Sequence, residues 1–186
     1  MTGVQTCALP ISRTFHESDL LVAESIRRGL FDDLEPASLA ALASVFVYEH
    51  RSPEPPHAPW YPSPLVRRRW QSIAALSYEL EDIERASGLA VHRPPDPTFV
   101  AVAFAWAAGE GFAEVVAEED LTGGDFVRTM KQLLDLLRQM ALVAPQRATR
   151  HAAEQAADRL FRGVVAASSA VEISPQKVGN DDDPQG

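Results

Sequence analysis

The segment at residues 121–140 constrains the fold more than any other part of the chain. Its apolar residues recur at intervals of four, three, four and three, at Phe126, Met130, Leu133, Leu137 and Met140. This spacing places them on one face of an α-helix, and Val127, Leu134 and Ala141 widen that face. One face of this helix must therefore belong to a hydrophobic core.

Helical patterns cover most of the remaining chain, and no segment alternates as a strand would. Helices are expected at residues 18–31, 35–50, 65–88, 99–109 and 112–116, and a final amphipathic helix at 146–168. Ser18 is an N-cap candidate, Gly29 ends the first helix, and Pro36 suits a first helical turn. In the third helix the expected apolar side consists of Val66, Trp70, Ile73, Leu80 and Ile83. Segment 99–109 is apolar all round and should be central, so the predicted fold is an all-α multi-helix bundle.

The helix after residue 121 also has a charged face. Thr122 is a good N-cap, and Asp125 stands three residues later, where a capping-box acid would be. On the side opposite the apolar face lie Arg128, Lys131, Asp135 and Arg138. From spacing alone, this stripe is either a solvated face with ion pairs one turn apart or a binding surface.

The proline-rich segment 52–64 holds six prolines in thirteen residues, so it predicts a long loop. Trp60 and Tyr61 within it could anchor a protein partner. This possibility gives an alternative function, in which the chain is a self-contained helical scaffold that binds partners through the loop.

Both ends of the chain are expected to lie outside the fold. Residues 1–12 resemble the translation of a sequencing adapter and are interpreted as a non-native extension, which would also account for Cys7, the only cysteine. Residues 172–186 are polar and acidic and predict a disordered tail. The bundle is therefore expected at 13–171, which is the length of one domain.

Composition and charge narrow the range of functions. The net charge of −9 argues against a protein that holds nucleic acid by its overall charge, so any such contact must come from a local stripe or from a partner domain. No apolar run is long enough to predict a membrane span, and no signal peptide is evident, so a cytoplasmic protein without membrane contact is expected.

The sequence contains no motif that predicts an active site or a bound cofactor or metal in this chain. It has no phosphate-binding glycine loop with a following lysine and no zinc-protease motif. Its five histidines lack metal-ligand spacing and are interpreted as surface or loop residues: His16, His50, His57, His92 and His151. The acidic pairs at 32–33 and 118–119 are interpreted as helix-start charges.

Three blocks of the sequence resemble a known family. They are "SDLLVAESIRRGLFDDLEPASLAALASVFVYEHR", "WAAGEGFAEVVAEEDLTGGDFVRTMKQLLDLLRQM" and "RGVVAAS". In this order, over residues 15–171, they resemble the DSHCT domain, the C-terminal helical domain of DExH-box RNA helicases of the superkiller and exosome-cofactor type. The similarity is greatest to the actinobacterial HelY-type members.

The resemblance implies a function for the bundle within a larger enzyme. In that family the bundle packs against two RecA-like motor lobes, which bind ATP and magnesium, and one of its helices faces single-stranded RNA. By resemblance, Arg128 matches an arginine that meets RNA bases, and Glu24 matches an acidic residue on the facing helix. Lys131 and Arg138 are weaker candidates for RNA contact. From the sequence itself, Glu24 could instead form an ion pair one turn along its own helix, with Arg27 or Arg28.

Overall fold

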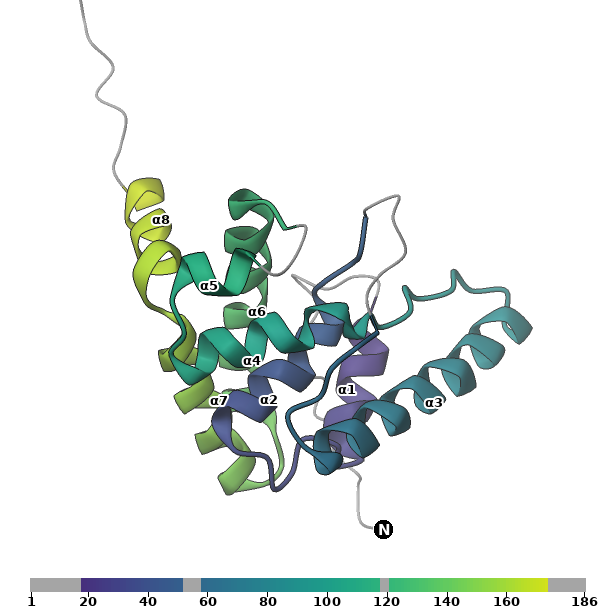
Figure 1. The fold of residues 1–186 in the computed structure, drawn as a ribbon. Coiled ribbons are helices and arrows are strands. Elements are labelled where there is room, and N and C mark those ends of the chain that lie inside the picture. The colour runs from purple at the N-terminus through teal and green to yellow at the C-terminus, as the bar shows by residue number, and fades with distance from the viewer. Residues whose placement is uncertain (1–17, 52–57, 118–120, 174–186) are drawn as a thin grey trace, which may run out of the picture.

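The computed structural model describes residues 18–51, 58–117 and 121–173, and these residues form an all-α bundle (Figure 1). Within them lie α1 (Asp19–Arg27), α2 (Pro36–Ala43), η1 (Ser44–Phe46), α3 (Pro64–Ala86), η2 (Pro97–Phe99), α4 (Val100–Ala108), α5 (Phe112–Ala117), α6 (Gly123–Val143), α7 (Arg147–Leu160) and α8 (Gly163–Ile173). No strand occurs in the described ranges, so the predicted fold class is confirmed.

The expected non-native residues 1–12 and most of the expected tail lie outside the described residues. Helix α8 ends at Ile173, two residues inside the segment that was predicted as tail.

The centre of the domain is formed by α2 and α4, which cross the middle of the view in Figure 1. All residues from 37 to 47 are buried, so α2 and η1 are surrounded by other elements. Trp106 of α4 lies at the meeting point of three helices. Its ring is edge-on to Phe126 of α6 at 5.2 Å, and its Nε1 donates to the carbonyl of Leu160 in α7 at 3.0 Å. Aromatic packing and a satisfied indole N–H thus join the central helix to α6 and α7.

The predicted apolar face of α6 is confirmed, because all five of its principal residues are fully buried. These are Phe126, Met130, Leu133, Leu137 and Met140, each with 0% of its surface exposed. The predicted N-cap is also present, since the Thr122 hydroxyl oxygen accepts from the Asp125 backbone N–H at 3.1 Å.

The turn after α1 ends one helix and secures another. Gly29 has φ +66°, and the backbone N–H of Leu30 donates to the Ser25 carbonyl at 3.0 Å, as in a Schellman C-cap. Asp32 then reaches the start of α7, where its carboxylate accepts from the Gln146 amide at 2.6 Å and from the Thr149 hydroxyl. Asp32 therefore lies at a helix start, as the sequence predicted. The helix is α7, however, and not α2, which follows Asp32 in the sequence. Residues 118 and 119 lie outside the described ranges.

The prediction of one final helix was wrong, because the chain forms two helices that are separated at Phe161 and Arg162. The Arg162 guanidinium lies 3.6 Å from the centre of the Trp106 ring and donates to the carbonyls of Trp106 and Glu110, both at 2.6 Å. Gly163 follows with φ +50° and starts α8. The helical spacing continues through this break, so periodicity alone does not reveal it.

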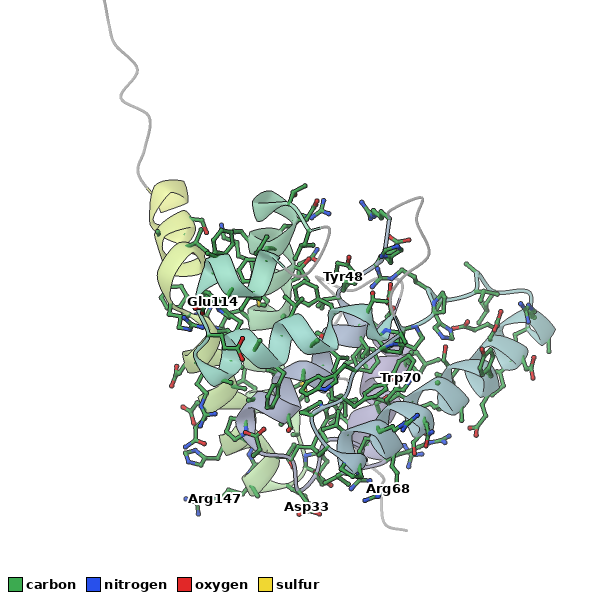
Figure 2. All side chains as sticks on the ribbon, in the orientation of Figure 1. Asp33, Tyr48, Arg68, Trp70, Glu114 and Arg147 are labelled. Atoms are coloured by element: carbon green, nitrogen blue, oxygen red, sulfur yellow. The ribbon has the colours of Figure 1, made fainter. Side chains whose placement is uncertain are left out.

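The outer half of α3 extends away from the body of the domain, and the segment after it runs back along the helix (Figure 1). Figure 2 shows Trp70 on the side of α3 that faces the body. Two expectations fail in the outer half. Ile83, predicted to be on the apolar side, is 59% exposed, and His92, predicted to be a surface or loop histidine, is buried in the returning segment.

Both differences have one cause, a buried polar chain of three residues. His92 Nδ1 lies 2.8 Å from Glu84 Oε2, and His92 Nε2 lies 2.8 Å from the Ser77 hydroxyl oxygen. The His92 backbone N–H also donates to Glu84 at 2.9 Å. Glu84 takes the inward position on α3 that the pattern assigned to Ile83. Its hydrogen bonds outweigh desolvation, so the pKa of Glu84 lies below its ordinary value.

The substitution Gly163→Ala should destabilise the domain by about 1–2 kcal/mol, because an alanine is strained at positive φ. The added Cβ would also lie 3.3 Å from the Trp106 ring, which Arg162 holds in place. Urea unfolding of the purified chain measures this change.

Gly124→Ala is the matched control, since the position is helical and the nearest atom to an added Cβ is 3.9 Å away. This variant should be more stable than the parent chain by about 0.4–1 kcal/mol. Equal effects of the two substitutions would contradict the assignment of strain to the junction between α7 and α8.

Candidate nucleic-acid interface

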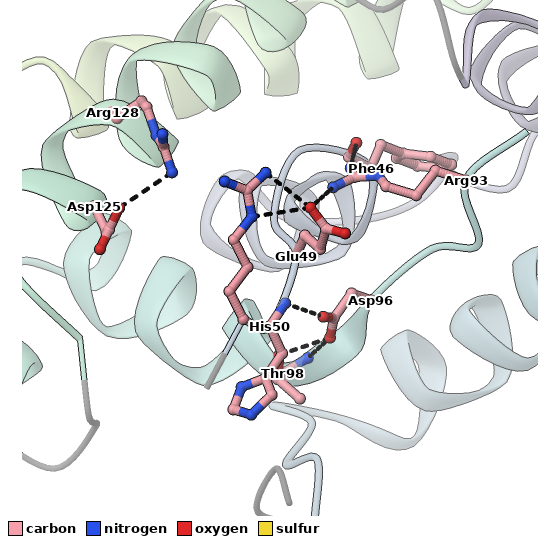
Figure 3. Close-up of polar contacts among 9 residues, drawn as sticks. Phe46, Glu49, His50, Arg93, Asp96, Thr98, Asp125 and Arg128 are labelled. Atoms are coloured by element: carbon pink, nitrogen blue, oxygen red, sulfur yellow. Dashed lines mark hydrogen bonds and ion pairs between the residues drawn. The ribbon is translucent and has the colours of Figure 1, made fainter. Parts of the chain in front are cut away.

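The face of α6 opposite its buried side is the surface to which the family resemblance assigned RNA contact. Arg128 lies on this face with 58% of its side chain exposed. Its Nη2 donates to Asp125 Oδ1 at 3.1 Å, within the same helix (Figure 3). Asp125 in turn accepts from the Thr122 hydroxyl at 2.7 Å, so the residues that start α6 also hold the arginine.

The ion pair between Arg128 and Asp125 is weak. Both side chains are about half exposed, and pairs of this kind on a helix surface contribute about 0.3–0.5 kcal/mol. Stacking of a base on a side chain is worth about 1–3 kcal/mol. A nucleic acid could therefore displace Asp125 from Arg128 at little cost.

Two further basic residues share the charged face of α6. Lys131 is partly buried one turn after Arg128. Arg138 is 57% exposed and lies 3.9 Å from Asp135. The Arg138 guanidinium carbon is also 5.7 Å from the centre of the Phe161 ring, so this side chain contacts the junction between α7 and α8. Its position thus fits a structural role as well as a binding role.

Glu24 lies on another helix, α1, and has the ion pairs that the sequence offered as the alternative to RNA contact. Arg27 Nε donates to Glu24 Oε2 at 2.7 Å, and Arg28 Nε donates to Oε1 at 3.0 Å. These hydrogen bonds, first that of Arg27, lower the pKa of Glu24 to about 2. Arg28 also reaches Glu79 on α3 at 3.1 Å, so Glu24 belongs to a chain of charges that joins α1 to α3.

A second group of charged residues was not found from the sequence. Arg51 donates to Glu49 at 2.9 Å, and Arg93 donates to the Phe46 carbonyl at 2.7 Å and lies 3.8 Å from Glu49. Figure 3 shows the Arg128 side chain pointing from α6 toward the side that carries Glu49 and Arg93. Spacing along the chain gave no signal of this group, because its two segments are more than 40 residues apart.

The described residues contain neither a candidate metal centre nor a helix that could span a membrane. Among them, no group of three or more His, Cys, Asp or Glu side chains could hold a metal ion. No helix in the described ranges is long and apolar enough to span a bilayer.

Comparison with known proteins identifies the family. The sequence model of the DSHCT (NUC185) domain matches residues 8–168. The chain therefore belongs to the DSHCT domain family, and most of the relatives that it matches are named as helicases.

Three relatives illustrate the similarity. The "Probable helicase HelY" of Mycobacterium leprae is 40% identical over 166 residues, which cover 84% of this chain and 18% of the relative. The human "Exosome RNA helicase MTR4" is 32% identical over 130 residues, 68% of this chain and 12% of the relative. The "DExH-box ATP-dependent RNA helicase DExH10" of Arabidopsis thaliana is 27% identical over 160 residues, 81% of this chain and 16% of the relative. The chain thus spans less than a fifth of the length of these relatives.

The low pKa of Glu24 leads to a prediction on stability. A carboxylate whose pKa is lower in the folded state contributes stability above its unfolded value of 4.5, and this contribution is lost as the pH falls toward about 2. Glu24→Gln should therefore be less stable than the parent chain at neutral pH, and the difference should shrink as the pH falls below about 4.5. Urea unfolding across this pH range provides the measurement. A difference that stays constant with pH would show that the ion pairs of Glu24 contribute nothing to stability.

Proposed function

We propose that this chain is the accessory domain of an ATP-dependent DExH-box RNA helicase and guides single-stranded RNA during unwinding. The outer face of α6 contacts the RNA, with Arg128 as the principal residue. RecA-like motor lobes of the same protein bind ATP and magnesium and pack against the bundle. Membership of the DSHCT family and the names of the relatives support this proposal.

The observation that carries the proposal is the combination of exposure and weak tethering at Arg128. The buried face of α6 fixes the rotation of the helix, so Arg128 must point outward. Asp125 keeps the guanidinium in one place through a pair that a base can displace, as the energies above indicate. A planar guanidinium can stack on a base or bind a phosphate through two hydrogen bonds, which a lysine cannot do in the same way.

The other predicted contacts are proposed with more limited roles. Lys131 and Arg138 add positive charge along α6, although Arg138 is partly engaged by Phe161. Glu24 already accepts hydrogen bonds from Arg27 and Arg28, and one of these bonds would have to break before an RNA base or ribose could donate to Glu24. Its contact with RNA is therefore more costly than that of Arg128.

Exposed apolar residues support packing against a further domain. Four of them lie on the outer half of α3 and on the segment that follows: Tyr78, Ile83, Leu89 and Val91, which are 70%, 59%, 64% and 43% exposed. Large apolar side chains that gather in one projecting part of a domain are typical of a contact surface. We infer that the motor lobes cover this part of the protein.

The alternative function, a scaffold that binds proteins through the proline-rich loop, is supported by one residue. Trp60 is 51% exposed, with its ring 5.6 Å from that of Phe104, so it could anchor a partner. Tyr61 fits this role less well, since it packs against the core and burial raises its pKa. A scaffold would lose its partner on Trp60→Ala and keep it on Arg128→Ala.

Arg128→Ala, in a helicase that joins this chain to its motor lobes, should weaken the binding of single-stranded RNA by about 1–3 kcal/mol, because one base stack is lost. The stability of the bundle should change by less than about 0.5 kcal/mol, because no core packing is removed. Fluorescence anisotropy with labelled RNA and urea unfolding measure the two effects.

Leu133→Ala serves as the control, since it leaves a cavity in the core and should cost about 2–5 kcal/mol of stability. If Arg128→Ala unfolds the bundle, or if RNA affinity and RNA-stimulated ATP hydrolysis both stay at the parent level, the charged face is structural or merely solvated.

The purified 186-residue chain should not hydrolyse ATP, with or without RNA. Phosphoryl transfer requires groups that cradle the phosphates and hold magnesium, and the sequence has no motif that supplies them. Release of phosphate from ATP by the purified chain is the measurement. Hydrolysis that is stimulated by RNA and copurifies with the chain to homogeneity would overturn this expectation.

A further inference from the structure

A cluster of arginines lies where α3 and α7 begin. Its members are Arg67, Arg68 and Arg69 of α3 and Arg147 and Arg150 of α7, and we refer to them as the basic edge. Figure 2 shows Arg68 and Arg147 along the lower margin of the domain, with Asp33 between them. The five arginines and the two aspartates of the intervening turn give a local net charge of +3, in a chain whose net charge is −9.

The turn around Asp32 brings the two helix starts together. Arg69 Nη2 approaches the Asp32 carbonyl at 3.5 Å, and Gln146, the residue before α7, donates to the Asp32 carboxylate at 2.6 Å. The Arg150 guanidinium donates to the carbonyls of Ala144 and Pro145 at the end of α6. The basic edge is therefore one continuous part of the surface and includes the C-terminal end of α6.

The basic edge differs from the rest of the domain in how its charges are paired. Of the fourteen arginines in the described ranges, eight have a carboxylate oxygen within 4.0 Å. Of the remaining six, Arg162 lies over Trp106, and the other five are the members of the basic edge. Asp33 is exposed and forms no ion pair with any of them among the described residues. In the described part of this acidic domain, most arginines outside the basic edge therefore have a carboxylate partner, and the arginines of the basic edge have none.

Two of these arginines, Arg147 and Arg67, also occupy positions that are unfavourable within the domain itself. Arg147 is the first residue of α7, and Arg67 lies in the first turn of α3. Both lie next to the positive end of a helix dipole, where a positive charge is disfavoured. Neither a carboxylate nor a helix dipole of the domain compensates the charges of Arg147 and Arg67. The arrangement therefore fits the binding of an anion from another molecule.

We propose that the basic edge binds the phosphate backbone of single-stranded RNA, as a second contact surface beyond the outer face of α6. This inference rests on the proposed RNA contact. Arg128 and the end of α6 at Val143 are about 22 Å apart at 1.5 Å per residue, and four residues later the chain reaches Arg147. An RNA strand that passes Arg128 and follows α6 therefore arrives at the basic edge.

The chemistry of the edge suits phosphate better than a protein surface. Arginine is the residue that forks onto phosphate oxygens, and several guanidinium groups in a row match a backbone with repeated charges. Among the described residues, Leu142 is the one large exposed apolar side chain within five residues of a member of the edge. Exposed arginines thus outnumber exposed apolar side chains along this part of the chain, whereas a protein interface typically has an apolar centre.

The test is the salt dependence of RNA binding by the purified 186-residue chain. Fluorescence anisotropy with a fluorescein-labelled single-stranded RNA is measured between about 25 and 200 mM salt. The double variant Arg68→Gln with Arg147→Gln should bind at least about tenfold more weakly at low salt. Its plot of log affinity against log salt should be shallower by about 1.4, because each lost phosphate contact on a single strand removes about 0.7 from the slope.

The control is Arg85→Gln with Arg159→Gln, which changes the net charge equally but removes arginines that are paired with carboxylates elsewhere. This variant should lose less than about threefold in affinity. The proposal is overturned if the parent chain shows no salt-dependent binding, if both double variants lose affinity equally, or if the edge variant keeps the parent slope. Circular dichroism confirms that both variants are folded. Arg128→Ala in the same assay separates the two proposals, because loss of the Arg128 contact leaves the slope that the edge contributes.

Discussion

Burial of one face of α6 is the constraint on which the rest of the structure depends. Its apolar side packs against α7 and α2 and contacts Trp106 of α4, so the helix has no freedom to rotate. Once that side is fixed, the charged residues of α6 must lie outside, with Arg128 at the start and Arg138 toward the end. The same packing places the first residues of α7 beside Asp32, and so assembles the basic edge. A core of ordinary helix packing thus determines where both charged surfaces lie.

The domain distributes its charges in two distinct ways. Within the bundle, arginines are neutralised by nearby carboxylates, as in the chain from Glu24 through Arg28 to Glu79 that links α1 and α3. Arg128 is also paired, but by a single half-exposed carboxylate that a ligand can displace. The basic edge has no such pairs among the described residues. In the proposed function, this acidic protein presents local positive surfaces to RNA, while its remaining negative surface would repel the strand and limit binding to these places.

The sequence predicts those features that depend on local spacing. The α6 apolar face, the Thr122 cap and the Gly29 helix end all follow from patterns within a few residues, and the family resemblance follows from contiguous motifs. Features that depend on distant residues were missed. The break at Arg162 requires the Trp106 ring 56 residues earlier, and the burial of His92 requires the chain to turn back along α3 so that Ser77, 15 residues earlier, and Glu84 can reach it. The basic edge was missed for the same reason, since α3 and α7 are far apart in sequence and each contributes only part of it.

Site-specific crosslinking tests the central claim, that the outer face of α6 contacts RNA, most directly. A photoreactive amino acid would replace Arg128 in a helicase that joins this domain to its motor lobes, and Glu154, which is exposed on α7, in a matched protein. After irradiation with labelled single-stranded RNA, the account predicts a crosslink from position 128 and little or none from position 154. Crosslinking from position 154 alone, or equal crosslinking from both, would contradict it.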